Sequence, residues 1–152
     1  MNDSLIATGT VTIAAAPAKV WDYLTNATHT RKYMFGCGPI TDWQPGSPLL
    51  WQGVWEDKEA VFVKGLVVQH EPYQVLAFTT IDPNNPATPD IPENHTTVTY
   101  RLEAAGDGTV LHVTQGDFAT VAEGEKRYNE VSAGGGWQTL LETIKELVET
   151  GV

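Results

Sequence analysis

The strongest constraint on the fold lies near the end of the chain, in residues 134–149, which read Gly-Gly-Gly-Trp-Gln-Thr-Leu-Leu-Glu-Thr-Ile-Lys-Glu-Leu-Val-Glu. Apolar residues recur there at the three- and four-residue spacing of one helical face: Trp137, Leu140, Leu141, Ile144, Leu147 and Val148. Gly151 follows, at a position where helices often stop. A continuous apolar stripe must be buried against another element. Because most of the preceding chain reads as short strands and turns, we predict one long helix lying on a sheet.

The rest of the chain predicts a first strand at 5–14, short helices near 17–25 and 29–33, and then a meander of strands. The meander strands are expected at 40–43, 49–55, 60–70, 74–81, 96–103 and 109–115. A polar hairpin turn is expected at 56–59, and residues 117–125 are expected to link the last strand to the closing helix. Residues 82–93 contain four prolines and are predicted to form a long loop, of the kind that is often functional or mobile.

Charge and composition exclude several classes of protein. The net charge of −10 disfavours binding to nucleic acid, whose affinity comes largely from Lys and Arg contacts to phosphate, and to anionic membranes. No apolar run approaches the length of a membrane span, and the first residues lack the pattern of a signal peptide. Cys37 is the only cysteine, so an internal disulfide is impossible. We therefore expect a cytoplasmic protein folded as one domain, residues 1–152.

Several segments, taken in order, resemble a known family. They are Ala16-Pro17-Ala18-Lys19-Val20-Trp21-Asp22-Tyr23-Leu24-Thr25, Pro45-Gly46-Ser47, Gly65-Leu66-Val67-Val68 leading to Glu71-Pro72, Gly106-Asp107-Gly108-Thr109, and Gly136-Trp137-Gln138-Thr139-Leu140-Leu141. Together they resemble the START-like (SRPBCC, birch-pollen-allergen-like) superfamily, in the branch named for the activator of the heat-shock protein 90 ATPase. The resemblance implies an α+β helix-grip fold for this chain: a curved seven-stranded antiparallel sheet wrapped around a long C-terminal helix, with two short helices between strands 1 and 2.

The resemblance also implies a cavity between the sheet and the helix. An ordinary core would explain any single aromatic residue of this chain, but small-molecule sites are also concave and mostly apolar. The predicted lining residues are Tyr33, Phe35, Trp51, Trp55, Phe62, Phe78, Tyr100, Trp137 and Leu141. Many members read Trp-Phe where this chain has residues 32–35, Lys-Tyr-Met-Phe, and the 82–93 loop is long. Both places border the cavity mouth in the family, so the identity of the ligand does not carry over.

Other residue patterns give weaker signals. The histidines His29, His70, His95 and His112 lack the spacing of paired zinc ligands, so neither a metal site nor a cofactor is predicted. Cys37, between two glycines, is interpreted as a small, partly buried hydrophobe rather than a nucleophile. For the glycines at 134–136, a helix that begins after them is favoured over a flexible gate at the cavity.

Three functions stay open. The favoured hypothesis is a non-catalytic module that binds a small hydrophobic molecule, such as a lipid, polyketide or aromatic metabolite, as a monomer or homodimer. The second is a chaperone partner with a role in the stress response, as the family name implies. Because the resemblance does not extend to the additional N-terminal domain of true co-chaperones, we expect no stimulation of the ATPase. The third is a cyclase- or hydrolase-like enzyme, for which Tyr100, His70 and Glu56 are the polar groups to inspect.

Overall fold

The computed structural model describes residues 4–34 and 36–151. Its strands are β1 (Ala7–Ile13), β2 (Gly38–Ile40), β3 (Pro48–Trp55), β4 (Lys58–Glu71), β5 (Val75–Thr80), β6 (Thr96–Ala105) and β7 (Gly108–Gly116). Its helices are α1 (Pro17–Thr25), α2 (Ala27–Thr30), α3 (Gly124–Ser132) and α4 (Gly136–Thr150), with 3-10 turns η1 (Pro92–Asn94), η2 (Phe118–Thr120) and η3 (Ala133–Gly135). The strands form one seven-stranded sheet in the order β1-β7-β6-β5-β4-β3-β2, antiparallel at each pairing.

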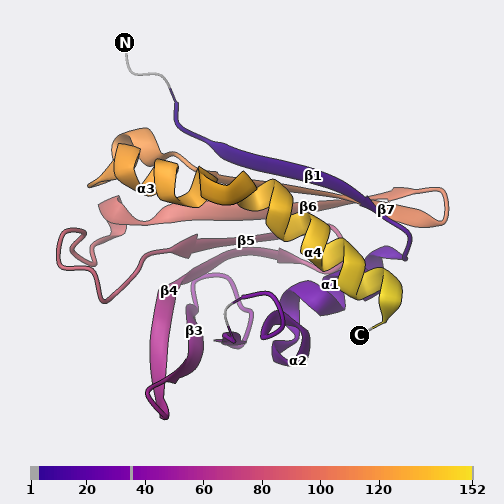
Figure 1. Cartoon of the computed structure of the whole chain (residues 1–152), viewed down its shortest axis with the longest axis horizontal. Helices are drawn as coiled ribbons and strands as arrows, with labels where there is room; N and C mark the ends of the chain where they lie inside the picture. Colours follow the sequence, from indigo (N-terminus) through magenta and orange to yellow (C-terminus); the bar gives the residue numbers. More distant parts are fainter. Residues whose placement is uncertain (1–3, 35, 152) are drawn as a thin grey trace.

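The arrangement in space is the one that the sequence predicts. The sheet bends so that β3 and β4 turn away from the long strands β5–β7, and α4 lies across it beside β1 (Figure 1). The two short helices α1 and α2 come between β1 and β2 in the chain. The expected helix-grip architecture, a curved antiparallel sheet with a long C-terminal helix, is therefore confirmed.

The sheet bends where its strands are irregular. The pairing of β4 with β5 shifts register between Val67 and Gln69, and β3 shifts against β4 between Trp51 and Gln52. At Gly65 a Cβ atom would lie 1.7 Å from the carbonyl oxygen of Thr79, so only glycine allows the backbones to approach this closely. Bulges of this kind bend a strand and increase its twist, which here curves the sheet around the helix.

Helix α4 buries the stripe that the sequence predicts. Leu141, Ile144 and Val148 are fully buried, and Trp137 packs partly buried against the same core. The helix comes so near to β1 that a Cβ atom on Gly9 would lie 3.1 Å from Leu141 Cδ1. The stripe is thus the seam between helix and sheet, as the apolar periodicity predicts.

Polar side chains of α4 also satisfy the free edge of β1. The side-chain amide of Gln138 accepts a hydrogen bond from the Thr10 amide (3.0 Å) and donates one to the Thr10 carbonyl (2.8 Å). Glu149 Oε2 accepts from the amide of Ala14 (2.8 Å), and Lys145 Nζ donates to the carbonyl of Thr12 (2.8 Å). An edge strand whose outward groups are already bonded is a poor template for another strand.

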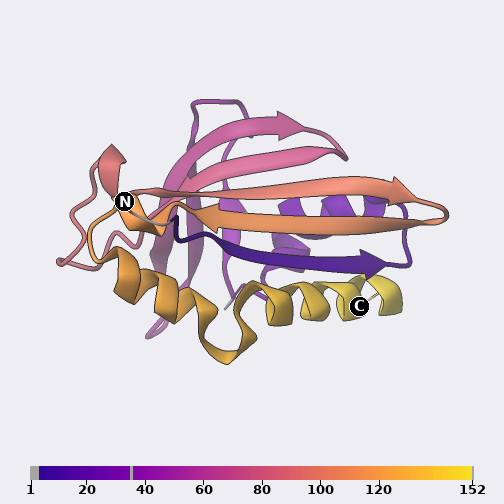
Figure 2. The same ribbon diagram turned by 90° about the horizontal axis from the view of Figure 1, so that it is seen from above.

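Several sequence predictions are wrong in their boundaries. The helix expected near 29–33 is α2 at Ala27–Thr30, and the turn expected at 56–59 is shorter because β4 begins at Lys58. The strand expected at 40–43 is β2 at Gly38–Ile40, because Trp43 has a left-handed backbone (φ 62°) that cannot continue a strand. The segment expected to be a link, 117–125, already contains η2 and the first residues of a separate helix, α3. Glycines 134, 135 and 136 all have positive φ (65°, 93° and 57°), so α3 and α4 are two helices with a break between them (Figure 2).

Candidate ligand-binding site

A row of aromatic rings lies inside the sheet, between its strands and the start of α4. The ring centroids of Trp51 on β3 and Phe78 on β5 are 5.7 Å apart, and those of Phe78 and Tyr100 on β6 are 6.2 Å apart. Tyr100 in turn meets Trp137 of α4 edge-on at 5.8 Å. Four of the predicted lining residues therefore form one continuous row, which we call the aromatic row.

The alternation of the strands places these side chains on the same face of the sheet. In β6, Val98 and Tyr100 are buried while the residues between and beside them are more exposed, as the sequence pattern predicts. Phe78 pairs with Val98 across the sheet, so its ring is the diagonal neighbour of Tyr100. Cross-strand neighbours on one face of a sheet are within reach of each other when the side chains are aromatic.

Trp137 is held at its end of the row by Gln115. The Trp137 indole N–H donates to Gln115 Oε1 (2.9 Å), and the Gln115 amide nitrogen donates to Thr96 Oγ1 (3.0 Å) and to Thr80 Oγ1 (3.4 Å). These hydrogen bonds fix the orientation of both the Gln115 side-chain amide and the Trp137 indole ring. Sequence reasoning missed Gln115; the available signal was a polar residue at an inward position of an alternating strand, two residues after Val113.

Trp51, at the other end, has no such support. Its side chain is buried, with only 4% of the residue exposed, and its Nε1 has no hydrogen-bond partner within the part of the chain that the structure describes. A buried donor left unpaired costs roughly 1–3 kcal/mol, which is why such groups are rare in native proteins. The aromatic row thus contains one satisfied indole, that of Trp137, and one that is not.

The other predicted lining residues differ in how deeply they are buried. Leu141 and Tyr33 are buried in the same core, and the Tyr33 hydroxyl group donates to the carbonyl of Tyr23 (2.6 Å). Phe62 is partly buried, with its ring edge over Gly53. Trp55 lies apart at the tip of the β3–β4 hairpin, where 63% of it is exposed. Phe35, also predicted to line the cavity, lies outside the described residues.

The buried phenols stay neutral. Burial, and secondarily the neighbouring Tyr100, raises the pKa of Tyr33 well above the ordinary tyrosine value. Burial likewise raises the pKa of Tyr100 and, less strongly, that of the Cys37 thiol. At neutral pH Tyr33, Tyr100 and Cys37 therefore act as hydrogen-bond donors or apolar surface rather than as phenolate or thiolate nucleophiles.

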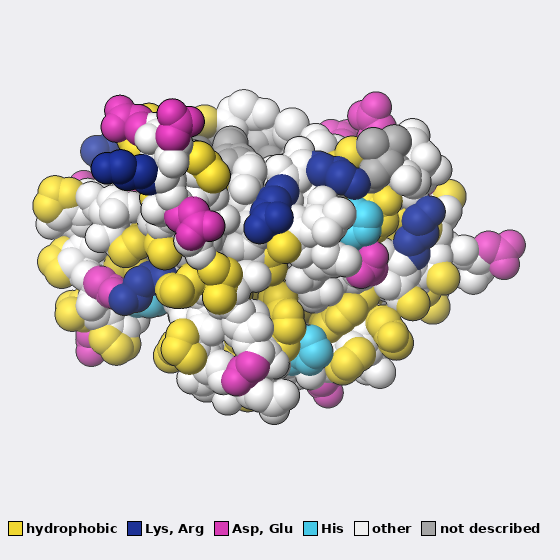
Figure 3. All heavy atoms as spheres, turned by 90° about the horizontal axis from the view of Figure 1, so that it is seen from below, with side chains coloured by type: hydrophobic (Ala, Val, Ile, Leu, Met, Phe, Trp, Pro, Cys, Tyr) yellow, Lys and Arg dark blue, Asp and Glu magenta, His cyan; other side chains and the backbone are white. Residues whose placement is uncertain are grey.

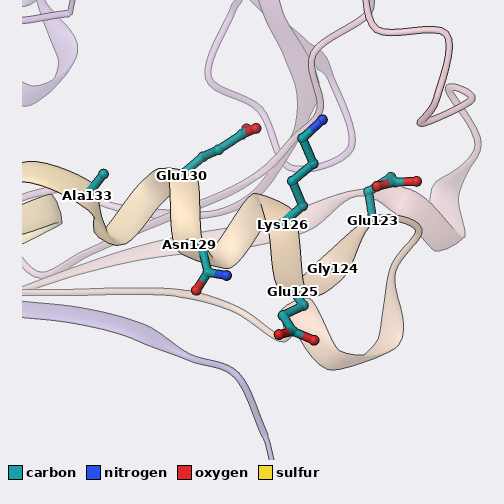
Figure 4. Close-up of a pocket in the computed structure, with 7 residues that line it drawn as sticks. All are labelled: Glu123, Gly124, Glu125, Lys126, Asn129, Glu130 and Ala133. Carbon is teal, nitrogen blue, oxygen red and sulfur yellow. The ribbon is translucent and has the colours of Figure 1, made fainter.

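Two cavities lie along the helix pair. One, of about 210 Å³, opens at the α3–α4 break and is lined by Ile6, Ala7, Thr8, Tyr128, Val131, Ser132, Gly135, Gly136 and Trp137. The other, of about 740 Å³, is an open depression along α3, lined by Glu123, Gly124, Glu125, Lys126, Asn129, Glu130 and Ala133. The side chains of this second cavity diverge to opposite sides of the helix rather than converging on a point (Figure 4). Only the first adjoins the aromatic row, through Trp137.

The polar groups considered for catalysis come from different segments of the sheet and form no hydrogen bond, ion pair or ring contact with one another among the described residues. His70 is packed between the rings of Trp21 (5.3 Å) and Trp43 (5.7 Å), Glu56 lies in the turn after β3, and Tyr100 is inside the sheet.

Among residues 4–34 and 36–151, no three or more His, Cys, Asp and Glu side chains are grouped so that they could hold a metal ion. No helix in the described chain has the length and apolarity needed to cross a membrane. On the face shown in Figure 3, apolar side chains lie between acidic and basic ones.

The proline-rich loop is anchored to the sheet. His95 Nε2 lies 2.8 Å from Asp90 Oδ1, and Lys64 on β4 forms an ion pair with the same carboxylate. These two contacts lower the pKa of Asp90. The loop over residues 82–93 is confirmed, and its carboxylate is engaged by a neighbouring strand rather than pointing freely to solvent.

A curved antiparallel sheet that closes on a C-terminal helix over a row of aromatic side chains defines a helix-grip domain. Within this class, the family model described as "Activator of Hsp90 ATPase homolog 1-like protein" matches residues 14–149. The chain therefore belongs to this family, as the sequence resemblance indicates. No curated protein shows significant sequence similarity to it.

Solved structures agree with this assignment. A solution structure of a Cytophaga hutchinsonii protein is 32% identical, with a TM-score of 0.74 over 99% of this chain and 98% of that one. The Aha1 dimer from Colwellia psychrerythraea is 16% identical (TM-score 0.64; 96% of this chain, 97% of that one). DynU16, a protein from the dynemicin biosynthetic locus, is 16% identical (TM-score 0.70; 99% of this chain, 49% of that one). The last two likenesses show the fold alone.

Proposed function

We propose that this protein is a non-catalytic module that binds a small hydrophobic molecule between the sheet and α4, at the aromatic row. The observation that carries the proposal is the continuity of that row, from buried Trp51 to partly buried Trp137 beside the cavity at the α3–α4 break. Small-molecule sites are typically apolar and aromatic, with few polar groups. The described interior fits this pattern.

The helix break is where we place the entrance. Gly134, Gly135 and Gly136 separate α3 from α4 and give the chain backbone freedom that other residues lack. Trp137 follows at once and lines both the small cavity and the aromatic row. A modest displacement of the α3–α4 junction would therefore expose the row, which makes the flexible-gate interpretation of the glycines part of this proposal.

Binding without catalysis is the version that the side chains support best. The phenols of Tyr33 and Tyr100 and the thiol of Cys37 have raised pKa values, His70 is packed against the ring of Trp21, and Glu56 lies in the turn after β3. The origin of DynU16 in a biosynthetic locus is consistent with a small organic ligand.

Free, buried Cys37 suits a reducing compartment such as the cytoplasm. A homodimer is compatible with the Colwellia relative, whose structure is described as a dimer.

The test is native mass spectrometry of the purified protein, compared with the same sample after denaturing extraction, followed by titration with a library of uncharged polycyclic compounds. We expect a bound small molecule, or micromolar binding of library members that is weakened at least fivefold by Trp137→Ala and left unchanged by Trp55→Ala. Trp55 is the matched control because it is the exposed tryptophan of the same sheet. A folded protein that binds no library member would refute the proposal. A rise in ATP hydrolysis when it is added to a heat-shock protein 90 would favour the chaperone alternative.

A further inference from the structure

We infer that the ligand is an uncharged, flat aromatic molecule with a carbonyl-type oxygen, and that this oxygen accepts a hydrogen bond from Trp51 Nε1. The inference rests on the proposed function and names the chemical class that the same site takes. It adds a specific polar anchor to an interior that is mostly apolar and aromatic.

The unpaired donor on Trp51 points to a ligand atom. Only 4% of Trp51 is exposed, and its Nε1 finds no acceptor among the described residues. Burying such a group without a partner costs roughly 1–3 kcal/mol, and most native proteins avoid it. An acceptor oxygen on the ligand would recover this loss, whereas a pure hydrocarbon would leave it in place.

The second indole of the row shows what a purely structural tryptophan looks like in this fold. Trp137 Nε1 is paired with Gln115, whose amide is held by Thr96 and Thr80. Residues 4–34 and 36–151 thus provide a dedicated acceptor for the indole that borders the proposed entrance, and none for the indole in the interior. If both served only as core, both would be expected to be paired.

The absence of a buried cation among the described residues sets the charge of the ligand. Their buried polar side chains are Thr30, Thr88, Asn94, Thr96, Thr109 and Gln115. The buried phenols of Tyr33 and Tyr100 have raised pKa values and remain neutral. A carboxylate drawn into this interior would lack an opposite charge, and an unpaired buried charge is far more costly than an unpaired amide or indole. An uncharged carbonyl oxygen meets the need of Trp51 without that cost.

The geometry of the row sets the shape of the ligand. Successive rings from Trp51 to Trp137 meet edge-on or tilted, with centroids 5.7, 6.2 and 5.8 Å apart. A flat aromatic ligand can exchange these ring–ring contacts for equivalent ones of its own as α4 moves at its glycine break. The carbonyl oxygen of the ligand would then lie at the β3 end of the aromatic row, beside Trp51.

The experiment compares three probes that share one skeleton: 9-fluorenone, fluorene, which lacks the oxygen, and 9-fluorenone-4-carboxylate. For the wild-type protein we expect fluorenone to bind about tenfold more tightly than fluorene, the effect of one buried hydrogen bond, and the carboxylate to bind more weakly than fluorenone. In Trp51→Phe the Kd values for fluorenone and fluorene should become about equal. Trp55→Phe, the matched control, should keep the tenfold preference. Using the ratio of the two Kd values cancels any general effect of the smaller ring.

A spectroscopic readout follows the atom directly. The five tryptophans give five indole N–H signals in a proton–nitrogen spectrum, and that of Trp51 is identified by its loss in Trp51→Phe or, if that variant does not fold, by triple-resonance assignment. Fluorenone should shift the Trp51 signal downfield, and fluorene should not. Equal binding of both probes with an unmoved Trp51 signal would overturn this inference and leave the proposed function standing. Tighter binding of the carboxylate would overturn the neutral class. Binding of none of the three would overturn the inference, and the proposed function would still be decided by the broader library and the native mass spectrum.

Discussion

Replacing Gln138 with alanine should uncover the free edge of β1. In the native structure the Gln138 amide occupies the place of a neighbouring strand, because it accepts from the Thr10 N–H and donates to the Thr10 carbonyl. Alanine keeps the helix propensity and removes both bonds. The Thr10 groups then face water, and β1 becomes an edge open to pairing along this part of its length.

The size of the effect follows from the two lost bonds. Both are solvent-exposed, so each contributes at the low end of the usual net range, and together we expect a loss of about 1–1.5 kcal/mol in the free energy of unfolding. For a chain of this length, that corresponds to a fall in Tm of roughly 2–6 °C. Glu146→Ala is the matched control, because Glu146 is an exposed residue of α4 and its side chain makes no hydrogen bond or ion pair among the described residues. It should leave the Tm within about 1 °C.

Two measurements check this expectation. Thermal unfolding gives the difference in stability between the two variants, and native-state hydrogen exchange gives the protection of the Thr10 amide, which should drop in Gln138→Ala and persist in Glu146→Ala. The reasoning is refuted if the two variants unfold at the same temperature with equal protection at Thr10. In that case the Gln138 bonds contribute nothing in water, and α4 is held on β1 by its apolar stripe alone.

Three further predictions can be checked by the same unfolding measurements. Gly65→Ala should cost about 3 kcal/mol or more, because its new Cβ would clash with the Thr79 carbonyl oxygen, whereas Gly106→Ala, with open space but a positive φ, should cost about 1 kcal/mol. Leu141→Ala should cost about 2–5 kcal/mol, because the side chain is fully buried at the helix–sheet seam. The carboxylate of Asp117 accepts from the amides of Leu5 and Ala119, which lowers its pKa. The stabilising effect of the ionised carboxylate is therefore present above the ordinary aspartate pKa and lost as the pH falls through the lowered value. The free energy of unfolding of Asp117→Asn should thus change less between neutral and acid pH than that of the wild type, measured by circular dichroism against pH.

The architecture was predictable because local patterns alone determine much of it. The helix at 17–25 coincides with α1, and the apolar stripe of α4 is buried as its spacing predicts. The boundaries failed where the backbone takes a left-handed conformation at a residue other than glycine, as at Trp43. A tryptophan in a Thr-Asp-Trp segment reads as strand by composition, and only the turn it makes with its neighbours sets its φ. Helix α3 was not predicted separately because its residues are mostly polar and carry little periodic signal.

The candidate site shows a limit of a different kind. From the sequence, Trp51 and Trp55 are equivalent aromatic residues four positions apart on one strand, and both were predicted to line the interior. The structure separates them, because Trp51 lies in the buried part of β3, whereas Trp55 ends the strand at the exposed hairpin. Whether a buried indole finds an acceptor depends on side chains from other strands, as Gln115 of β7 does for Trp137. No periodicity encodes that pairing, so the sequence cannot distinguish the paired indole of Trp137 from that of Trp51, which has no partner among the described residues.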